Sequence, residues 1–393
     1  MNIHIHRGQN QIGGSVIEIS TESARIFLDI GIELDEGKNI DVPQIDGLFC
    51  GTKKCDAVFI SHYHADHIGL ADYLLPNIPI YIGETAYRII KTASDYMEAE
   101  LKFLPTFMED GKTITIKDIK ITPISCDHSA FDSYMLLIET SEETVLYTGD
   151  FRANGRMNFD KLLDVVPTVD TLIIEGTTLS RDEQTENIPE EKLEEIAVEY
   201  LNKHKGPAFI MMSAQNIDRV ITAHNIAKRT NRQFLMDIYS ADIARSAGMA
   251  VDEARVFMTG GNKQYEMLQR YKKNKIGKHE ISKKPFIMCI RSSMKNYLSK
   301  LSELISFEDG VLFYGMWKGY LEQSNTKEFI EFLKSKGVRL HILHTSGHAD
   351  SKTIEKLIDD IKPKKIIPVH TENTDWFDKF KNVEILKNSA DIK

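Results

Sequence analysis

One short segment, from Ser61 to His67, constrains the chain more than any other part of the sequence. It reads Ser-His-Tyr-His-Ala-Asp-His. It begins where an apolar run at residues 56–61 ends, and this run predicts a buried strand. Three imidazoles and a carboxylate so close together are costly to bury unless they share a partner, and a divalent metal ion is the natural one. Alternate side chains of the segment can face two different ions. The segment therefore predicts a metal centre at the end of a strand.

Other candidate ligands follow other predicted strands. Asp29 ends an apolar stretch at 24–29, His128 follows one at 120–125, Asp150 follows one at 144–148, and His370 follows one at 365–369. Taken alone, each residue is more often a cap or a turn residue than a ligand. Because all of them lie at the ends of strands, together with the first motif they indicate one metal site.

The pattern of elements changes along the chain. Residues 1–204 predict mainly short strands, whereas strands and helices alternate after Pro207, which is typical of a largely parallel sheet. Residues 205–320 hold 19 Lys and Arg against 10 Asp and Glu, while the rest of the chain holds 30 against 48. We therefore expect one domain at 205–320, inserted between two parts of another at 1–204 and 321–393.

Composition excludes several other classes of protein. Hydrophobic residues make up 42% and charged residues 27%, as in ordinary soluble proteins. No apolar run approaches the roughly 18 residues of a membrane span, and the N-terminus does not resemble a secretory signal. The four cysteines are scattered, which argues against a disulfide framework. We expect a cytoplasmic protein with no membrane partner.

The ordered motifs resemble the metallo-β-lactamase superfamily, through Asp29, residues 62–67, His128 and Asp150. Further motifs resemble those of the β-CASP branch of this superfamily. They are Glu175 after the next strand, Ser346-Gly-His-Ala349 and Pro-Val-His370. Within this branch, Ser-Gly-His-Ala and residues 212–219 are most similar to ribonuclease J. The resemblance implies an αββα sandwich built from both chain ends with an inserted β-CASP α/β domain. Since the chain ends soon after His370, it implies a short form without the C-terminal domain.

The resemblance also implies a role for each site residue. Two zinc ions per chain are expected, and manganese is tolerated by such mixed nitrogen and oxygen ligands. Asp150 would bridge the ions, and Asp29 would orient a metal-bound histidine from behind. The first ion would be bound by His62, His64 and His128. The second ion would be bound by Asp66, His67 and His370.

Catalysis is expected to depend on Asp66 and on a pair formed by Glu175 and His348. His348, kept charged by Glu175, would give a proton to the leaving oxygen of a phosphodiester. Ser213 and Ser346 would contact phosphate groups of the substrate.

The expected function is that of a zinc-dependent ribonuclease acting as a 5′-exonuclease, an endonuclease or both. RNA or another single-stranded nucleic acid is the expected partner, and a homodimer is the commonest assembly for such proteins. The basic residues Lys272, Lys273 and Lys275 are expected to line the substrate groove, although a charge run is more commonly a solvated face. The alternatives are a DNA-directed nuclease, a phosphodiesterase of small nucleotides and a catalytically silent RNA-binding protein. An intact ligand set argues against the last of these.

Overall fold

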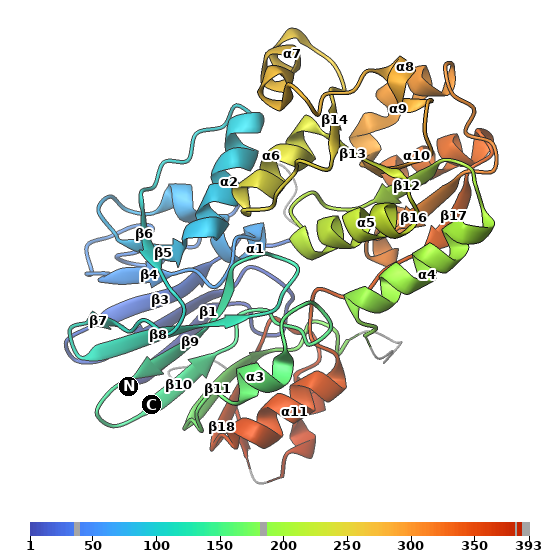
Figure 1. The fold of residues 1–393 in the computed structure, drawn as a ribbon. Helices are drawn as coiled ribbons and strands as arrows, with labels where there is room; N and C mark the ends of the chain where they lie inside the picture. The colour runs from blue at the N-terminus through green and yellow to red at the C-terminus, as the bar shows by residue number, and fades with distance from the viewer. Residues whose placement is uncertain (35–39, 181–186, 382, 387–393) are drawn as a thin grey trace. The chain divides into compact units, whose positions relative to one another are not determined.

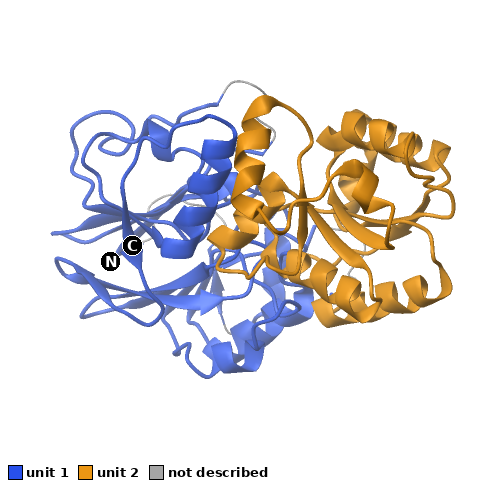
Figure 2. Ribbon diagram, turned by 45° about the horizontal axis from the view of Figure 1, so that its top comes forward, with its two compact units in different colours: residues 1–187, 347–393 blue, residues 188–346 orange. Residues whose placement is uncertain are grey.

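The computed structural model describes residues 1–34, 40–180, 187–381 and 383–386. The chain divides into two compact units (Figure 2). The first unit comprises residues 1–187 and 347–393, and the second comprises residues 188–346. Both chain ends therefore contribute to one unit, and the middle of the chain forms the other.

The first unit is built on two sheets (Figure 1). One has the order β1-β2-β3-β4-β5-β6, antiparallel from β1 to β3 and parallel from β3 to β6. Its strands are β1 (Asn2–Arg7), β2 (Val16–Ser20), β3 (Arg25–Ile30), β4 (Ala57–Phe59), β5 (Ile80–Gly83) and β6 (Pro105–Met108). The other has the order β19-β18-β11-β10-β9-β8-β7. Its strands are β7 (Ile114–Ile116), β8 (Ile119–Cys126), β9 (Ser133–Glu139), β10 (Thr144–Tyr147), β11 (Thr171–Glu175), β18 (Lys365–Val369) and β19 (Glu384–Ile385).

Alternation along the strands creates two cores. On β9, Leu136 and Ile138 belong to the core between the two sheets, whereas Met135 and Leu137 belong to the core on the opposite face of their sheet. Successive side chains of a strand point to opposite faces, so both faces of this sheet are apolar and both are covered. Helices cover the second face, as Ile354 of α11 packs in that core. The helices of this unit are α1 (Ala65–Ile68), α2 (Glu84–Tyr96), α3 (Phe159–Leu163) and α11 (Ser351–Ile361). This arrangement confirms the expected αββα sandwich.

A buried ion pair joins two neighbouring strands of the first sheet. Arg25 on β3 donates two hydrogen bonds of 2.7 Å to the carboxylate of Glu18 on β2. Burial alone would raise the pKa of Glu18, but the hydrogen bonds from His6 and Arg25 and the arginine charge hold it well below its ordinary value. The folded state therefore favours the ionised carboxylate.

The second unit is a parallel sheet with the strand order β14-β13-β15-β12-β16-β17. This confirms the parallel sheet expected from the alternation of strands and helices. Its strands are β12 (Ala208–Met211), β13 (Gln233–Asp237), β14 (Arg255–Phe257), β15 (Phe286–Ile290), β16 (Val311–Tyr314) and β17 (Arg339–Ile342). Its helices are α4 (Glu190–Lys203), α5 (Ile217–Arg229), α6 (Ile238–Ser246), α7 (Asn262–Leu268), α8 (Lys278–Ile281), α9 (Lys295–Ser302) and α10 (Ser324–Ser335). The short 3₁₀ segments of the two units are Ala71–Tyr73, Gln269–Tyr271, Ser292–Met294, Lys318–Glu322 and Thr374–Lys379.

The compact units divide at other points than the boundaries expected after residues 204 and 320. Helix α4 belongs to the second unit because Arg219 of α5 forms a buried, two-pronged ion pair with Glu190 at the start of α4. The same guanidinium donates to the carbonyls of Gly315 and Leu343. Strand β17 belongs there because it pairs with β16 along its whole length. In the described part of the chain, no helix has both the length and the apolar character needed to cross a membrane.

Candidate metal centre

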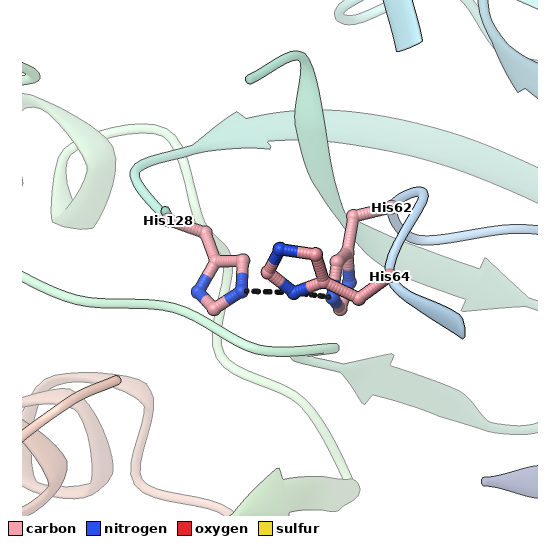
Figure 3. A group of neighbouring side chains, drawn as sticks. All are labelled: His62, His64 and His128. Carbon is pink, nitrogen blue, oxygen red and sulfur yellow. Dashed lines mark hydrogen bonds between the residues drawn. The ribbon is translucent and has the colours of Figure 1, made fainter. Parts of the chain in front are cut away.

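Three histidines from two loops converge at one end of the sandwich (Figure 3). His62 and His64 follow strand β4, and His128 follows strand β8. Nδ1 of His64 lies 3.2 Å from Nε2 of His62 and 3.2 Å from Nε2 of His128. Two nitrogens bound to one tetrahedral zinc ion lie about 3.4 Å apart, given zinc–nitrogen distances of 2.0–2.1 Å. The three ring nitrogens therefore have the spacing that one shared ion requires.

The outer ring nitrogens fix which nitrogen of each imidazole faces the centre. Nδ1 of His128 donates to the carbonyl oxygen of Gly347 at 2.5 Å, and Nδ1 of His62 lies 3.1 Å from the hydroxyl of Ser61. That hydroxyl donates to Asp29, so it accepts from His62. With Nδ1 protonated in both rings, each Nε2 has a lone pair directed at the centre. Second partners of this kind are the usual way in which proteins orient metal-binding histidines.

A second group of ligands lies beside the first. Oδ2 of Asp66 is 3.1 Å from Nε2 of His370, and Nε2 of His67 is 3.2 Å from Oδ2 of Asp150. Asp150 also lies 3.7 Å from Nε2 of His62, so its carboxylate is near both groups. Donor atoms of Asp66, His67 and His370 form one potential metal cluster, and those of His62, His67 and Asp150 form another. Asp150 therefore has the position that a bridging ligand needs.

Asp29 supports His67 from behind. Its buried carboxylate accepts from Nδ1 of His67 at 2.7 Å, from the amide and hydroxyl of Ser61 at 2.7 Å each, and from the hydroxyl of Tyr147 at 2.6 Å. The backbone of Asp29 has φ of 56°, in the left-handed region that Asp tolerates better than most residues. Its four donors hold the carboxylate in place and leave Nε2 of His67 facing Asp150.

The electrostatics of the site favour a bound cation. Burial lowers the pKa of His64 to about 4 and lowers the pKa values of His62 and His128 as well, so these rings are neutral and carry lone pairs at pH 7. For His67, burial would lower the pKa, but Asp150 and Asp29 raise it well above its ordinary value. The carboxylates around His67 therefore stabilise a positive charge, which a metal ion would supply in place of the proton.

Buried polar atoms without partners give the direct test of whether metal ions fit. Among the described residues, Nε2 of His67 and both carboxylate oxygens of Asp150 are buried and accept or donate no hydrogen bond. Buried polar groups are nearly always hydrogen-bonded, and each exception needs an explanation. Two metal ions on either side of Asp150 would satisfy these atoms, so the residues present fit the metals that the fold implies.

Glu175 and His348, the pair predicted to act in catalysis, lie next to these predicted ligands. Nδ1 of His348 is 3.1 Å from Oε2 of Glu175 and 3.5 Å from Oδ2 of Asp150. The side chain of His348 is 20% exposed, whereas that of Glu175 is fully buried. Glu175 also accepts from the backbone amides of Phe151 and Thr177. The carboxylate is therefore fixed, and the imidazole reaches from it toward solvent beside the metal ligands.

Strand register brings the last ligand into place. Strands β11 and β18 pair in parallel with Glu175 opposite Val369, so the residues that follow both strands are neighbours. Thr177 there accepts from Nδ1 of His370 at 2.7 Å and donates to the carbonyl of His370. Sequence reasoning missed Thr177, although the Thr-Thr that follows Glu175 offered the hydroxyl.

A buried ion pair joins two ligand-bearing loops, and it also escaped the sequence analysis. Nε of Arg152, two residues after Asp150, donates to Asp127, the neighbour of His128. Asp127 further accepts from the amide of Met157. No local pattern in the sequence indicates this pair, because Asp127 and Arg152 are 25 residues apart.

The serines and lysines predicted to contact substrate lie in separate segments of the second unit. Ser213 is exposed at the end of β12, and Ser346 is buried just before Gly347. Exposed side chains are found at Lys272, Lys273 and Lys275. The backbone beneath them is anchored to β14, since the amide of Val256 donates to the carbonyl of Asn274 and Ile276 donates to Val256. Their contact with substrate remains a prediction.

Comparison with known proteins places this site in a family. Residues 47–226 match the family described as beta-lactamase superfamily domain, and residues 336–379 match the Zn-dependent metallo-hydrolase RNA specificity domain. Ribonuclease J of Mycoplasma genitalium is 24% identical over 99% of this chain and 69% of its own length. Ribonuclease J of Helicobacter pylori is 25% identical over 93% of this chain and 55% of its own.

Two further likenesses come from other organisms. The probable RNase MJ4 of Methanocaldococcus jannaschii is 32% identical over 42% of this chain and 43% of its own length. A crystal structure of a protein of unknown function from Enterococcus faecalis superimposes with a TM-score of 0.82 at 21% identity, covering 100% of this chain and 99% of that one. The second likeness is one of fold. With two family domains in the expected order and ribonuclease J relatives along nearly its whole length, the chain belongs to the metallo-β-lactamase superfamily, as a ribonuclease J-like member of the β-CASP branch.

Proposed function

We propose that this protein is a zinc-dependent ribonuclease that hydrolyses RNA phosphodiester bonds with two metal ions. The observation that carries the proposal is the cluster of buried histidines and carboxylates around Asp150, whose oxygens form no hydrogen bond with the described residues. A site of this kind supplies a nucleophilic water at neutral pH and neutralises charge on a phosphate when its two metals are bound. The family domain matched at residues 336–379 is described by its RNA specificity, and this supports RNA as the substrate.

The geometry supports the following proposed metal-binding roles. His62, His64 and His128 would hold one ion, since their nitrogens are 3.2 Å apart around Nδ1 of His64. Asp66, His67 and His370 would hold the other, with Asp150 shared between the two. Nitrogen-rich ligation favours zinc, and the carboxylates make manganese an acceptable substitute.

His348 is the proposed general acid. The buried carboxylate of Glu175 lies 3.1 Å from its Nδ1 and would favour the imidazolium form. An RNA 3′-oxygen is a poor leaving group, so a proton supplied to it as the bond to phosphorus breaks lowers the barrier. Asp150 lies near the same ring and would keep the proton donor beside the attacked phosphate. Ser213 and Ser346 are proposed to contact phosphate groups of the same strand.

Two further properties belong to the proposal. A reducing cytoplasm suits four cysteines that are all unpaired, and burial raises the pKa values of Cys55 and Cys289 to about 12, which keeps them unreactive. A homodimer is proposed on the general frequency of two-fold assemblies, and size-exclusion chromatography with light scattering would test it.

The deciding experiment measures metal content and cleavage together. Purified protein should contain about two zinc ions per chain and should degrade end-labelled RNA, with 5′-monophosphate, triphosphate and hydroxyl ends distinguishing exonuclease from endonuclease action. His64→Ala should lose metal and activity, whereas His341→Ala, a partly buried histidine of the second unit, should lose neither. Cleavage of DNA in preference to RNA would favour the DNA-directed alternative. Full RNA cleavage after removal of all metal would refute the proposal.

A further inference from the structure

The second unit contains a cavity that the proposed mechanism does not use. Its volume is about 250 Å³, and it lies between the loop after β14, the segment before α8 and one face of α9. Its polar and aromatic lining is contributed by Thr259, Gly260, Lys278, Asn296, Tyr297 and Lys300. The cavity is smaller than the roughly 300–1,000 Å³ clefts that enclose drug-sized ligands. A compact polar group with its bound water therefore fits it better than a large ligand does.

Positive charge dominates the lining. Lys278 and Lys300 are the charged residues of the cavity wall, and none of the described lining residues is acidic. Within the described part of the chain, neither ammonium group has a carboxylate at ion-pair distance. Nζ of Lys278 instead lies 4.9 Å from the centre of the Tyr297 ring, which stacks on Phe257 at 4.9 Å. A cation–π contact of this kind places the ammonium at the wall without neutralising its charge.

The loop after β14 is shaped to surround an oxygen atom. The amide and hydroxyl of Thr259 and the amide of Gly260 all donate to one atom, Oε1 of Gln264, at 2.8, 3.1 and 3.2 Å. These donors are satisfied within the loop, so Gln264 fixes the loop in place beside the cavity. Gly260 and Gly261 have φ of 156° and 82°, and a Cβ at either position would meet no atom within 4 Å. The loop therefore keeps an open rim beside the two lysines.

We propose that this cavity binds a phosphate group, held between the ammonium groups of Lys278 and Lys300 with Asn296 as a further donor. Two unneutralised ammonium groups in one small concave wall match a doubly charged anion, and phosphate is the compact dianion that lysine binds most commonly. The phosphate is carried either by a free nucleotide or by the backbone of RNA bound to this unit. The site does not depend on the proposed ribonuclease activity, because all its residues belong to the second unit.

The test compares two double variants that remove the same charge. Binding of 5′-AMP and of inorganic phosphate is measured by calorimetry on the metal-loaded protein. Lys278→Ala with Lys300→Ala should weaken binding at least about tenfold, the loss expected for one or two charge-assisted hydrogen bonds. Lys283→Ala with Lys284→Ala is the matched control, since both side chains are exposed, lie outside the cavity lining and are not among the residues predicted to contact RNA. Phosphate bound at the metal centre contributes equally to both variants, so the difference between them reports on the cavity.

Two further measurements keep the result decisive. Lys278→Arg with Lys300→Arg keeps both charges and should keep binding, which separates charge loss from misfolding. Hydrogen exchange should show that 5′-AMP protects residues 258–261 and 276–278. If the phosphate comes from RNA, 5′-AMP competes with a 5′-phosphorylated RNA decamer and the alanine variant weakens both; if it comes from a free nucleotide, RNA binding is unchanged. Equal loss of 5′-AMP binding in the two alanine variants, or no protection of the loop, would overturn the proposal.

Discussion

Replacing Asp29 with Asn tests how the centre is held together. The carboxylate of Asp29 accepts from four donors, of which Oδ1 takes the amide of Ser61 and Oδ2 takes the other three. An amide side chain has one acceptor oxygen and one NH₂ group. If the amide oxygen takes the place of Oδ2, the NH₂ group faces the backbone N–H of Ser61. Both groups are then donors, and the backbone N–H cannot rotate away. If the NH₂ replaces Oδ2, Nδ1 of His67 must become the acceptor, and the proton moves to the nitrogen that faces Asp150.

The magnitude follows from which groups lose partners. In the first arrangement a buried N–H is left unsatisfied, which costs about 1–3 kcal/mol of folding free energy. In the second, Nε2 of His67 no longer has a lone pair for a metal ion. Changes to the partners of metal-binding histidines typically weaken metal binding 10–100-fold, or about 1.4–2.8 kcal/mol. Each orientation of the amide produces one of these losses, so we expect Asp29→Asn to keep its fold and to show the loss that belongs to the orientation it adopts.

The assay titrates zinc against a fluorescent chelator and measures urea unfolding of the metal-free protein. Tyr147→Phe is the control, because it removes one donor to Asp29 and leaves the carboxylate charge and the His67 proton in place. This control should bind zinc within about threefold of the unmodified protein, a difference well below the loss expected for Asn. Unchanged zinc affinity together with unchanged stability in Asp29→Asn, or equal losses in Tyr147→Phe, would refute the reasoning.

Three other outcomes are expected. The free energy of unfolding should fall as the pH drops below about 4.5, because the pKa of Glu18 is depressed only in the folded state and the unfolded chain takes up the proton first. In urea titrations, Glu18→Gln should make the free energy of unfolding less dependent on pH below that value. An unaltered acid profile in this variant would contradict the assignment. His348→Ala should keep its zinc, measured by elemental analysis, while RNA turnover falls about 10²–10⁴-fold; loss of zinc would make His348 a ligand. A triple alanine variant of the basic run should bind RNA with a weaker salt dependence. In filter binding at several salt concentrations, the slope of log affinity against log salt should flatten by about two units. An unchanged slope would mean that the basic run is a solvated face. That variant combines changes at Lys272, Lys273 and Lys275.

Strong local patterns made most of the fold predictable. The apolar runs predicted at 144–148 and 365–369 form the largely buried strands β10 and β18, whose bounds agree with the prediction to within one residue. The weaker elements escaped: β6 has two exposed residues among four, and α1 is a single turn inside the histidine motif. Where few residues are buried, the hydrophobic period gives no signal.

The candidate site was predictable in its ligands and not in its supports. Histidines and acids at strand ends stand out by type and position, and the structure places seven of them together. By contrast, Thr177 and the pair of Arg152 with Asp127 become recognisable only when strands distant in sequence are paired. The left-handed backbone of His370, with φ of 50°, likewise depends on its surroundings and on no local pattern.

The parallel pairing of β11 with β18 has a consequence for how the chain acquires its shape. Strand β11 ends at Glu175 and its partner begins at Lys365, so the whole second unit is synthesised before the sheet can close. Until then one edge of β11 has no neighbour, and a bare edge of apolar residues invites pairing with other chains. The nascent first unit already carries His62, His64 and His128, whereas His370 emerges only near the end. During synthesis, the three histidines proposed to bind the first ion are therefore present long before the ligand set proposed for the second ion is complete.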